Sequence, residues 1–175
     1  MSGNGRDASH TALVTGASSG IGLELARLFA ADAYSVVLVA RSEHKLQALA
    51  QDLTRRHGVR CEVVVADLAR RDGPAAVMQT IQSRGLRIDA LVNNAGYGLF
   101  GPFSETDLAT EIDMIQLNVA TLTELTKRVL PGMLSRHDGI ILNVASTAGF
   151  QPGPLMAVYY ATKSYVSVVK TPPFP

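Results

Sequence analysis

The chain has 175 residues, of which 47% are hydrophobic, and a formal net charge of +1 at pH 7. This length and composition fit one soluble globular domain with a sizeable core. The balanced charge and the lack of a basic run argue against a nucleic-acid or membrane-surface binder. We therefore expect a small molecule as the main partner.

The N-terminus and the cysteine content bear on the cellular compartment. Residues 1–9 are polar, and no apolar run in the chain approaches the roughly 20 residues that span a bilayer. Cys61 is the single cysteine and lies in an apolar run, which favours a buried thiol in a reducing compartment. We expect a cytoplasmic protein without membrane contact, with a disordered tail over residues 1–9 and an irregular proline-rich tail over residues 171–175.

The first two predicted elements are joined by a glycine-rich turn. Residues 11–14 form an apolar strand, and Ile21, Leu25, Leu28 and Phe29 recur at helical spacing behind it. Between them, residues 15–22 read Thr-Gly-Ala-Ser-Ser-Gly-Ile-Gly. Glycine permits positive φ and close backbone approach, and the following helix N-terminus attracts anions. The turn predicts a pyrophosphate seat, although its glycines alone also fit any tight connection between a strand and a helix.

The remaining elements alternate in the same way. Helices are expected from about Leu46 to Gly58, over 74–83, over 107–136 and from about residue 158, and strands at 35–40, 61–66, 90–92 and 140–144. The segment 107–136 fits one helix or two with a break near Asn118, and Pro131 is expected to kink or end it. Alternating strands and helices imply right-handed crossovers and a doubly wound parallel sheet within one domain over residues 10–170.

The end of the second strand bears on cofactor choice. In dinucleotide folds, an acidic residue about 20 positions after the glycine turn binds the ribose 2′-hydroxyl, and an arginine there accommodates a 2′-phosphate. Here the strand ends in Ala-Arg-Ser, with Arg41 at that step. Because a guanidinium pairs with phosphate, Arg41 favours NADP(H) over NAD(H), the alternative being a solvated surface cation.

The last predicted helix carries a tyrosine and a lysine at i and i+4. This spacing places Tyr159 and Lys163 on one helix face. A lysine cation about 4 Å from a phenolate, at an effective dielectric constant of about 20, stabilises it by at most ~4 kcal/mol. That attraction would bring the pKa of a phenol toward neutrality, which suits proton transfer to a carbonyl oxygen. Tyr160 competes for this role, but it is only three residues from Lys163.

Two further polar residues complete the catalytic hypothesis. Ser146 follows the strand at 140–144, where an α/β sheet presents ligand-binding groups, and its hydroxyl can polarise a substrate oxygen. Asn118 can offer its side-chain carbonyl to a water linked to Lys163. Taken singly, Ser146 also fits an ordinary turn serine, and Asn118 fits a helix irregularity. Tyr159 likewise fits a core aromatic, and Lys163 fits a surface cation. The four histidines show no paired spacing, and we expect no metal site at His10, His44, His57 or His137.

The glycine turn, the run Asn93-Asn94-Ala95-Gly96 and the four catalytic candidates together resemble the classical short-chain dehydrogenase/reductase family. Alone, the asparagine run also fits an ordinary turn, and Asp67 a helix cap. The resemblance spans residues 10–167 and implies a Rossmann-like, three-layer α/β/α fold. It implies NADP(H)-dependent interconversion of a carbonyl and a secondary alcohol, with a proton-transfer tetrad of Asn118, Ser146, Tyr159 and Lys163. Dinucleotide-binding residues implied by the resemblance are Gly16, Ser18, Ser19, Gly20, Ile21, Gly22, Arg41, Asp67, Leu68, Asn94, Ala95, Gly96, Tyr159 and Lys163.

The resemblance also predicts how the chain departs from the family. Family members usually run well beyond 175 residues, so the last two strands and the segment that covers the substrate are expected to be lacking. Pro172 and Pro173 cannot continue a helix, which suggests a truncation or a change of reading frame. With the strand order 3-2-1-4-5, the apolar strand at 140–144 becomes a sheet edge.

These departures leave a second functional hypothesis open. A truncated member could bind the dinucleotide, or its full-length relatives, without catalytic turnover. The family usually forms dimers or tetramers through its long helices, so we also expect a homo-oligomer.

Overall fold

A five-stranded parallel sheet forms the centre of the protein in the computed structural model, which describes residues 10–169. The strand order is β3-β2-β1-β4-β5, as expected from the sequence, and each neighbouring pair is parallel. The predicted tails, residues 1–9 and 171–175, lie outside the described residues. The strands are β1 (Thr11–Thr15), β2 (Ser35–Ala40), β3 (Cys61–Val65), β4 (Ala90–Asn93) and β5 (Ile140–Asn143).

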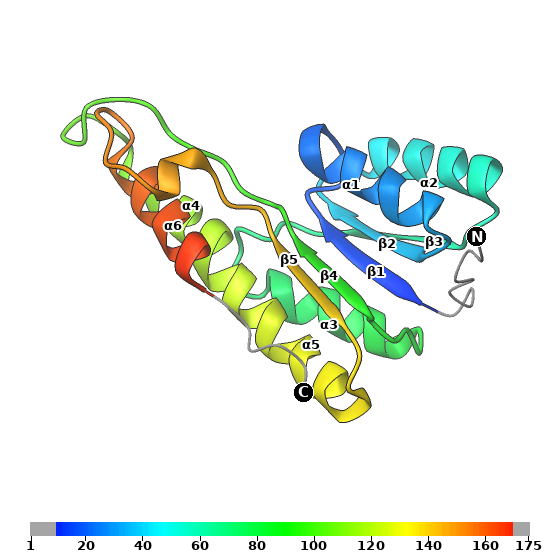
Figure 1. Ribbon diagram of the computed structural model, residues 1–175. Helices are drawn as coiled ribbons and strands as arrows, with labels where there is room; N and C mark the ends of the chain where they lie inside the picture. The colour runs from blue at the N-terminus through cyan, green and yellow to red at the C-terminus, as the bar shows by residue number, and fades with distance from the viewer. Residues whose placement is uncertain (1–9, 170–175) are drawn as a thin grey trace, which may run out of the picture.

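Helices cover both faces of this sheet (Figure 1). One face packs against α1 (Gly20–Ala31) and α2 (Glu43–His57), and the other against α3 (Gly73–Ser83) and α5 (Leu122–Arg136). Alternate residues of the central strands supply the two cores: Leu13 and Leu91 face α3 and α5, whereas Val14 and Val92 face α1 and α2. This period of two, buried on both sides, explains why the strands are nearly continuously apolar. The three-layer α/β/α fold is confirmed.

The buried face of α1 (Gly20–Ala31) differs in part from the predicted stripe. Ile21 and Leu28 are 62% and 63% exposed, whereas Gly22, Ala26 and Ala30 are buried. A Cβ atom at Gly22 would lie 2.5 Å from the carbonyl oxygen of Gly16, so the helix approaches the turn more closely than a large side chain permits. The small residues are fully buried, Leu25 and Phe29 are half-buried and pack against the same core, and Ile21 and Leu28 are left exposed.

The segment expected to be helical over 107–136 contains a π-helical section. The helix α4 (Leu108–Ile115) continues through the π-helix η1 (Gln116–Thr121) into α5, and Asn118 lies inside η1. The irregularity expected near Asn118 is therefore an inserted wider turn and not a break. Pro131 lies inside α5, which continues to Arg136, so the prediction that this proline could end the helix was wrong.

The apolar stripe of this long segment is buried only in its second half. Leu108 and Ile112 of α4 are exposed, whereas Leu125 and Val129 of α5 are buried against the sheet. The difference arises because α4 extends beyond the carboxyl ends of the strands, where it lies beside α6 (Ala157–Val168) (Figure 1). A short 3₁₀ turn, η2 (Thr147–Gly149), lies in the connection from β5 to α6.

The outer strand β5 pairs with β4 and has no second neighbouring strand among residues 10–169. Ile140 and Leu142 are 39% and 37% exposed, so the apolar strand is a sheet edge, as the strand order predicted. Cys61, on the opposite edge strand, is half-buried, and its burial raises the pKa of its thiol. Over residues 10–169, every helix is too short or too polar to cross a bilayer.

Candidate active site

The glycine turn lies at the carboxyl end of β1 and is bonded to the end of β4. Gly16 and Gly20 have positive φ values of 67° and 55°. A Cβ at Gly16 would lie 2.7 Å from the side-chain nitrogen of Asn94, so glycine is required there for space as well as for conformation. Asn94 donates from this nitrogen to the backbone oxygen of Thr15 (2.9 Å). The turn is thereby held open toward solvent.

Thr15 is the centre of this connection between the two strands. Its hydroxyl donates to the backbone oxygen of Val92 and accepts from the backbone N–H groups of Asn94 and Ala95, each at 3.0 Å. These bonds explain why the asparagine run directly follows β4. The asparagine run is thereby hydrogen-bonded to the end of β1, and Ala95 and Gly96 lie beside the glycine turn.

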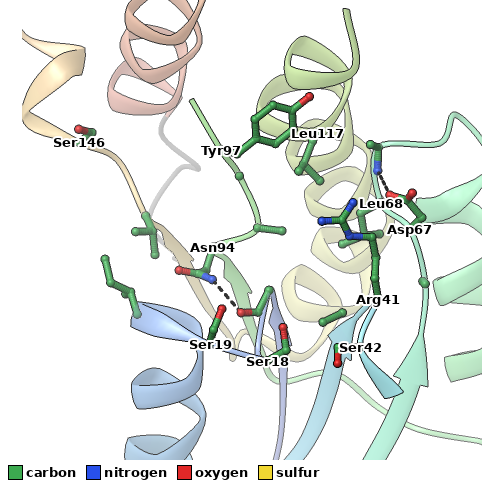
Figure 2. A pocket seen from close by; sticks show the side chains of 18 of the residues that line it. Ser18, Ser19, Arg41, Ser42, Asp67, Leu68, Asn94, Tyr97, Leu117 and Ser146 are labelled. Atoms are coloured by element: carbon green, nitrogen blue, oxygen red, sulfur yellow. Dashed lines mark hydrogen bonds between the residues drawn. The ribbon is translucent and has the colours of Figure 1, made fainter. Parts of the chain in front are cut away.

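A cavity of about 690 Å³ opens at the carboxyl ends of the strands. Figure 2 shows this cavity with Ser146 at one end and Arg41 and Asp67 at the other. Thirteen of the predicted site residues line it: Gly16, Ser18, Ser19, Ile21, Arg41, Asp67, Leu68, Asn94, Ala95, Gly96, Ser146, Tyr159 and Lys163. The other predicted residues, Gly20, Gly22 and Asn118, do not line the cavity. Gly20 and Gly22 belong to the glycine turn, and Asn118 is buried.

Arg41 and Asp67 lie at the end of the cavity formed by β2 and β3. The carboxylate of Asp67 accepts a hydrogen bond from the backbone N–H of Ala69 (3.0 Å), which Figure 2 shows as a dashed line. Arg41 is exposed and, among the described residues, has no carboxylate within ion-pair distance. Its guanidinium is therefore free to pair with an anionic ligand.

Tyr159 and Lys163 project from the first half of α6 into the other end of the cavity. Lys163 is buried, and its Nζ lies 5.9 Å from the centre of the Tyr159 ring. The ammonium donates to the backbone oxygen of Val144 at the end of β5 (2.9 Å). Burial lowers the pKa of Lys163 because desolvation disfavours the charged form.

Ser146 is held by the turn that follows β5. Its hydroxyl oxygen accepts from the backbone N–H of Ala148 (3.2 Å) and caps η2. A Cβ at Gly149 would lie 2.6 Å from the backbone oxygen of Lys163, so this turn packs directly on α6. The packing brings Ser146 to the same cavity as Tyr159 and Lys163.

The two adjacent tyrosines have different surroundings. Tyr159 lines the cavity, whereas the Tyr160 ring packs over Gly153, where an added Cβ would overlap it. Helical spacing separates their side chains by about 100°, so only one of them can face the cavity.

The side chain of Asn118 makes hydrogen bonds to the protein that the sequence did not predict. Its Oδ1 accepts from the backbone N–H of Tyr97 (3.2 Å). Its Nδ2 donates to the backbone oxygen of Tyr97 (2.9 Å) and to the hydroxyl of Thr162 (3.0 Å). Thr162 in turn donates to the backbone oxygen of Tyr159 (2.8 Å). The side-chain carbonyl expected to hold a water near Lys163 accepts one hydrogen bond from the loop after β4, and its second lone pair can still accept one from a water.

Several residues that line the cavity were not predicted from the sequence. Ser42 and Lys45 come from the start of α2, Tyr97 follows the asparagine run, and Leu117 lies in η1. Burial raises the pKa of Tyr97, and its hydroxyl donates to the backbone oxygen of Thr110 (2.7 Å). The position of Lys45, four residues after Arg41, was a signal available in the sequence. The sequence carried no such signal for Leu117, because the position of that side chain depends on how η1 packs.

Comparison with known proteins agrees with this geometry. A family model described as short chain dehydrogenase matches residues 10–170. The chain belongs to the short-chain dehydrogenase family.

Individual relatives are similar over most of this chain. A very-long-chain 3-oxoacyl-CoA reductase from Anas platyrhynchos is 40% identical over 161 residues, which are 89% of this chain and 51% of that protein. A short-chain dehydrogenase from Sphingobium yanoikuyae, solved in complex with NADPH, is 40% identical with a TM-score of 0.84, over 90% of this chain and 61% of that chain. L-sorbose reductase from Gluconobacter frateurii, solved with NADPH and L-sorbose, is 35% identical with a TM-score of 0.84, over 90% of this chain and 60% of that one. The chain thus spans about half the length of the curated relatives it matches.

Proposed function

We propose that the chain carries the cofactor-binding and proton-transfer parts of an NADP(H)-dependent oxidoreductase that interconverts a carbonyl and a secondary alcohol. The supporting observation is that Tyr159, Lys163 and Ser146 open onto the same cavity as the glycine turn and Arg41. The turn fits a dinucleotide, since its positive-φ glycines shape a strand-to-helix turn whose helix N-terminus attracts a pyrophosphate. Arg41 has no carboxylate within ion-pair distance among the described residues. Neighbouring structures solved with NADPH support the choice of cofactor.

Each residue at the other end of the cavity has a distinct role in this proposal. The nicotinamide, when bound, supplies or accepts a hydride at the substrate carbon. The Tyr159 hydroxyl donates a proton to the substrate oxygen during reduction and accepts it during oxidation. Ser146 donates a hydrogen bond to the same oxygen. Lys163 favours the phenolate by its charge and binds a ribose hydroxyl, and Asn118 positions Tyr159 through Thr162.

The paired tyrosines allow a sharp test. Tyr159→Phe should lower turnover of NADPH with a ketone by roughly 10²- to 10⁴-fold, because the general acid is lost. Tyr160→Phe is the matched control and should keep most of the activity, since its ring packs on Gly153. Turnover is measured by the loss of reduced-nicotinamide absorbance. Equal activity of the two variants would contradict the assignment of Tyr159.

The loops beside the cavity favour a substrate with an apolar group. Phe100 and Phe103 are 70% and 68% exposed after β4, and Phe150 is 81% exposed after η2. The backbone N–H of Gly101 donates to the carbonyl of Leu155 (2.8 Å), which joins the two loops. Since a similar curated protein is named a very-long-chain 3-oxoacyl-CoA reductase, 3-oxoacyl thioesters of graded chain length belong in the first substrate panel.

A second function is dinucleotide binding, or association with longer relatives, without turnover. It is favoured by the open edge of β5 among residues 10–169. NADPH binding by the purified chain with no reduction of any carbonyl in the panel would support this alternative and overturn the first proposal.

A cytoplasmic location and a dimer or tetramer formed through the exposed side of α4 also remain proposals.

A further inference from the structure

The cavity wall near the end of β2 carries a second cation besides Arg41. Lys45 is the third residue of α2, and its position lines the cavity together with Arg41 and Ser42. Lys45 is exposed and, within residues 10–169, lies beyond ion-pair distance of every carboxylate. Two adjacent cations on one wall therefore lack a protein partner.

The nearest acidic groups in the sequence are already engaged. Asp67 is the one carboxylate among the residues that line the cavity, and it accepts from the backbone of Ala69. Glu43, in the first turn of α2, accepts from the side chain of Gln47 (2.9 Å) farther along the helix. No carboxylate of the described residues therefore competes with an anionic ligand for Arg41 and Lys45.

Helix energetics do not explain a lysine at this position. The N-terminus of a helix carries a partial positive charge, so a cation in the first turn is unfavourable. Ser42, the N-cap residue, makes no capping bond with its side chain. An anion bound over this turn would be attracted both by Lys45 and by the helix dipole, and these attractions would offset the unfavourable position of the lysine.

We propose that Lys45 is the second cation of a phosphate-monoester subsite at this end of the cavity, and that it sets selectivity for NADPH over NADH together with Arg41. This inference rests on the proposed cofactor. Arg41 supplies planar, bidentate hydrogen bonds, and Lys45 supplies a point charge to the remaining oxygens of the 2′-phosphate.

Direct binding tests this assignment without requiring turnover. NADPH and NADH are titrated into the purified chain by fluorescence, for the wild type, Lys45→Gln and Lys127→Gln. Lys127 is the matched control, because it is an exposed lysine in the middle of α5 and does not line the cavity. Lys45→Gln should raise the Kd for NADPH roughly fivefold, the size expected for one exposed charge pair, and leave the Kd for NADH unchanged. Lys127→Gln should change neither.

Two further readouts separate a ligand contact from a structural role. The advantage of wild type over Lys45→Gln should grow from about pH 5 to about pH 7.5, because a phosphate monoester gains its second charge near pH 6. Without ligand, Lys45→Gln should raise the melting temperature by about 1 to 3 °C, because an unfavourable charge leaves the helix N-terminus.

The outcomes also distinguish the two proposals. A wild type that prefers NADPH, with an unchanged preference in Lys45→Gln, overturns the role of Lys45 and leaves the proposed function intact. Equal weakening of NADPH and NADH binding overturns it as well, since the contact would then not be to the 2′-phosphate. A wild type that binds neither dinucleotide overturns the proposed function and this inference together.

Discussion

Lys163 illustrates how burial tunes a single residue. Its ammonium is enclosed between α6 and the end of β5, with a backbone carbonyl as its hydrogen-bond acceptor and no carboxylate partner among the described residues. Burial lowers its pKa, so the folded chain releases this proton at a lower pH than the unfolded chain does. A buried cation without a counter-ion is a cost to stability, and groups of this kind gather at functional sites.

The sign of this shift predicts a pH dependence of stability. Below the folded pKa of Lys163, both states carry the charge and the full desolvation cost applies. As the pH rises from the folded value toward 10.5, the folded state loses the proton first and the cost is relieved. Lys163→Met should therefore be more stable than wild type near neutrality, and its advantage should shrink toward pH 10. Urea unfolding at the two pH values measures this, and a constant difference would contradict it.

At the scale of elements, the π-helical section η1 connects three parts of the chain. Asn118 bonds to both backbone groups of Tyr97 and, through Thr162, to the backbone of Tyr159. A Cβ at Gly96 would lie 2.8 Å from Oδ1 of Asn118, so the loop after β4 packs tightly against η1. We expect the position of Tyr159 on α6 to depend in part on this contact.

Removal of the Asn118 side chain should destabilise the fold. Asn118→Ala leaves the Tyr97 backbone groups and Thr162 without these partners, which we expect to cost about 2 to 4 kcal/mol. Gln116→Ala in the same π-helical section is the control, because Gln116 is only half-buried. Urea unfolding gives the free-energy differences, and hydrogen exchange at the Tyr97 amide should become faster only in Asn118→Ala. Equal stability of the two variants would rule out this connecting role.

For the whole molecule, β5 forms an apolar edge of the sheet, with Ile140 and Leu142 exposed. Its apolar residues have a strand partner on one side only, within residues 10–169. Unpaired apolar edges promote association with other chains, and charged residues on an edge prevent it. The chain should therefore associate as its concentration rises.

Ile140→Lys should slow this association, because it places a charge on the open edge. Gln151→Lys adds the same charge in the loop before α6, where the side chain is exposed, and serves as the control. Light scattering over a concentration series measures the effect. If both variants associate at the wild-type rate, the edge of β5 is not the interface, and the exposed face of α4 is the next candidate to test.

The sequence by itself determined the order of elements, the parallel sheet, the glycine turn and the positions of Arg41, Tyr159 and Lys163 in one cavity. These features depend on local periods: a strand alternates every two residues, a helix places i and i+4 together, and parallel strands end on one edge. The roles of these residues in catalysis and cofactor binding remain predictions.

Tertiary structure decided which face of α1 is buried, what the Asn118 side chain binds and that Lys45 lines the cavity. Each of these depends on contacts between segments far apart in the chain. Gly22 packs against the glycine turn while Ile21 stays exposed, and the Asn118 amide binds both backbone groups of Tyr97. Local patterns specify which groups a segment can present, and only packing between segments decides which partner each group meets.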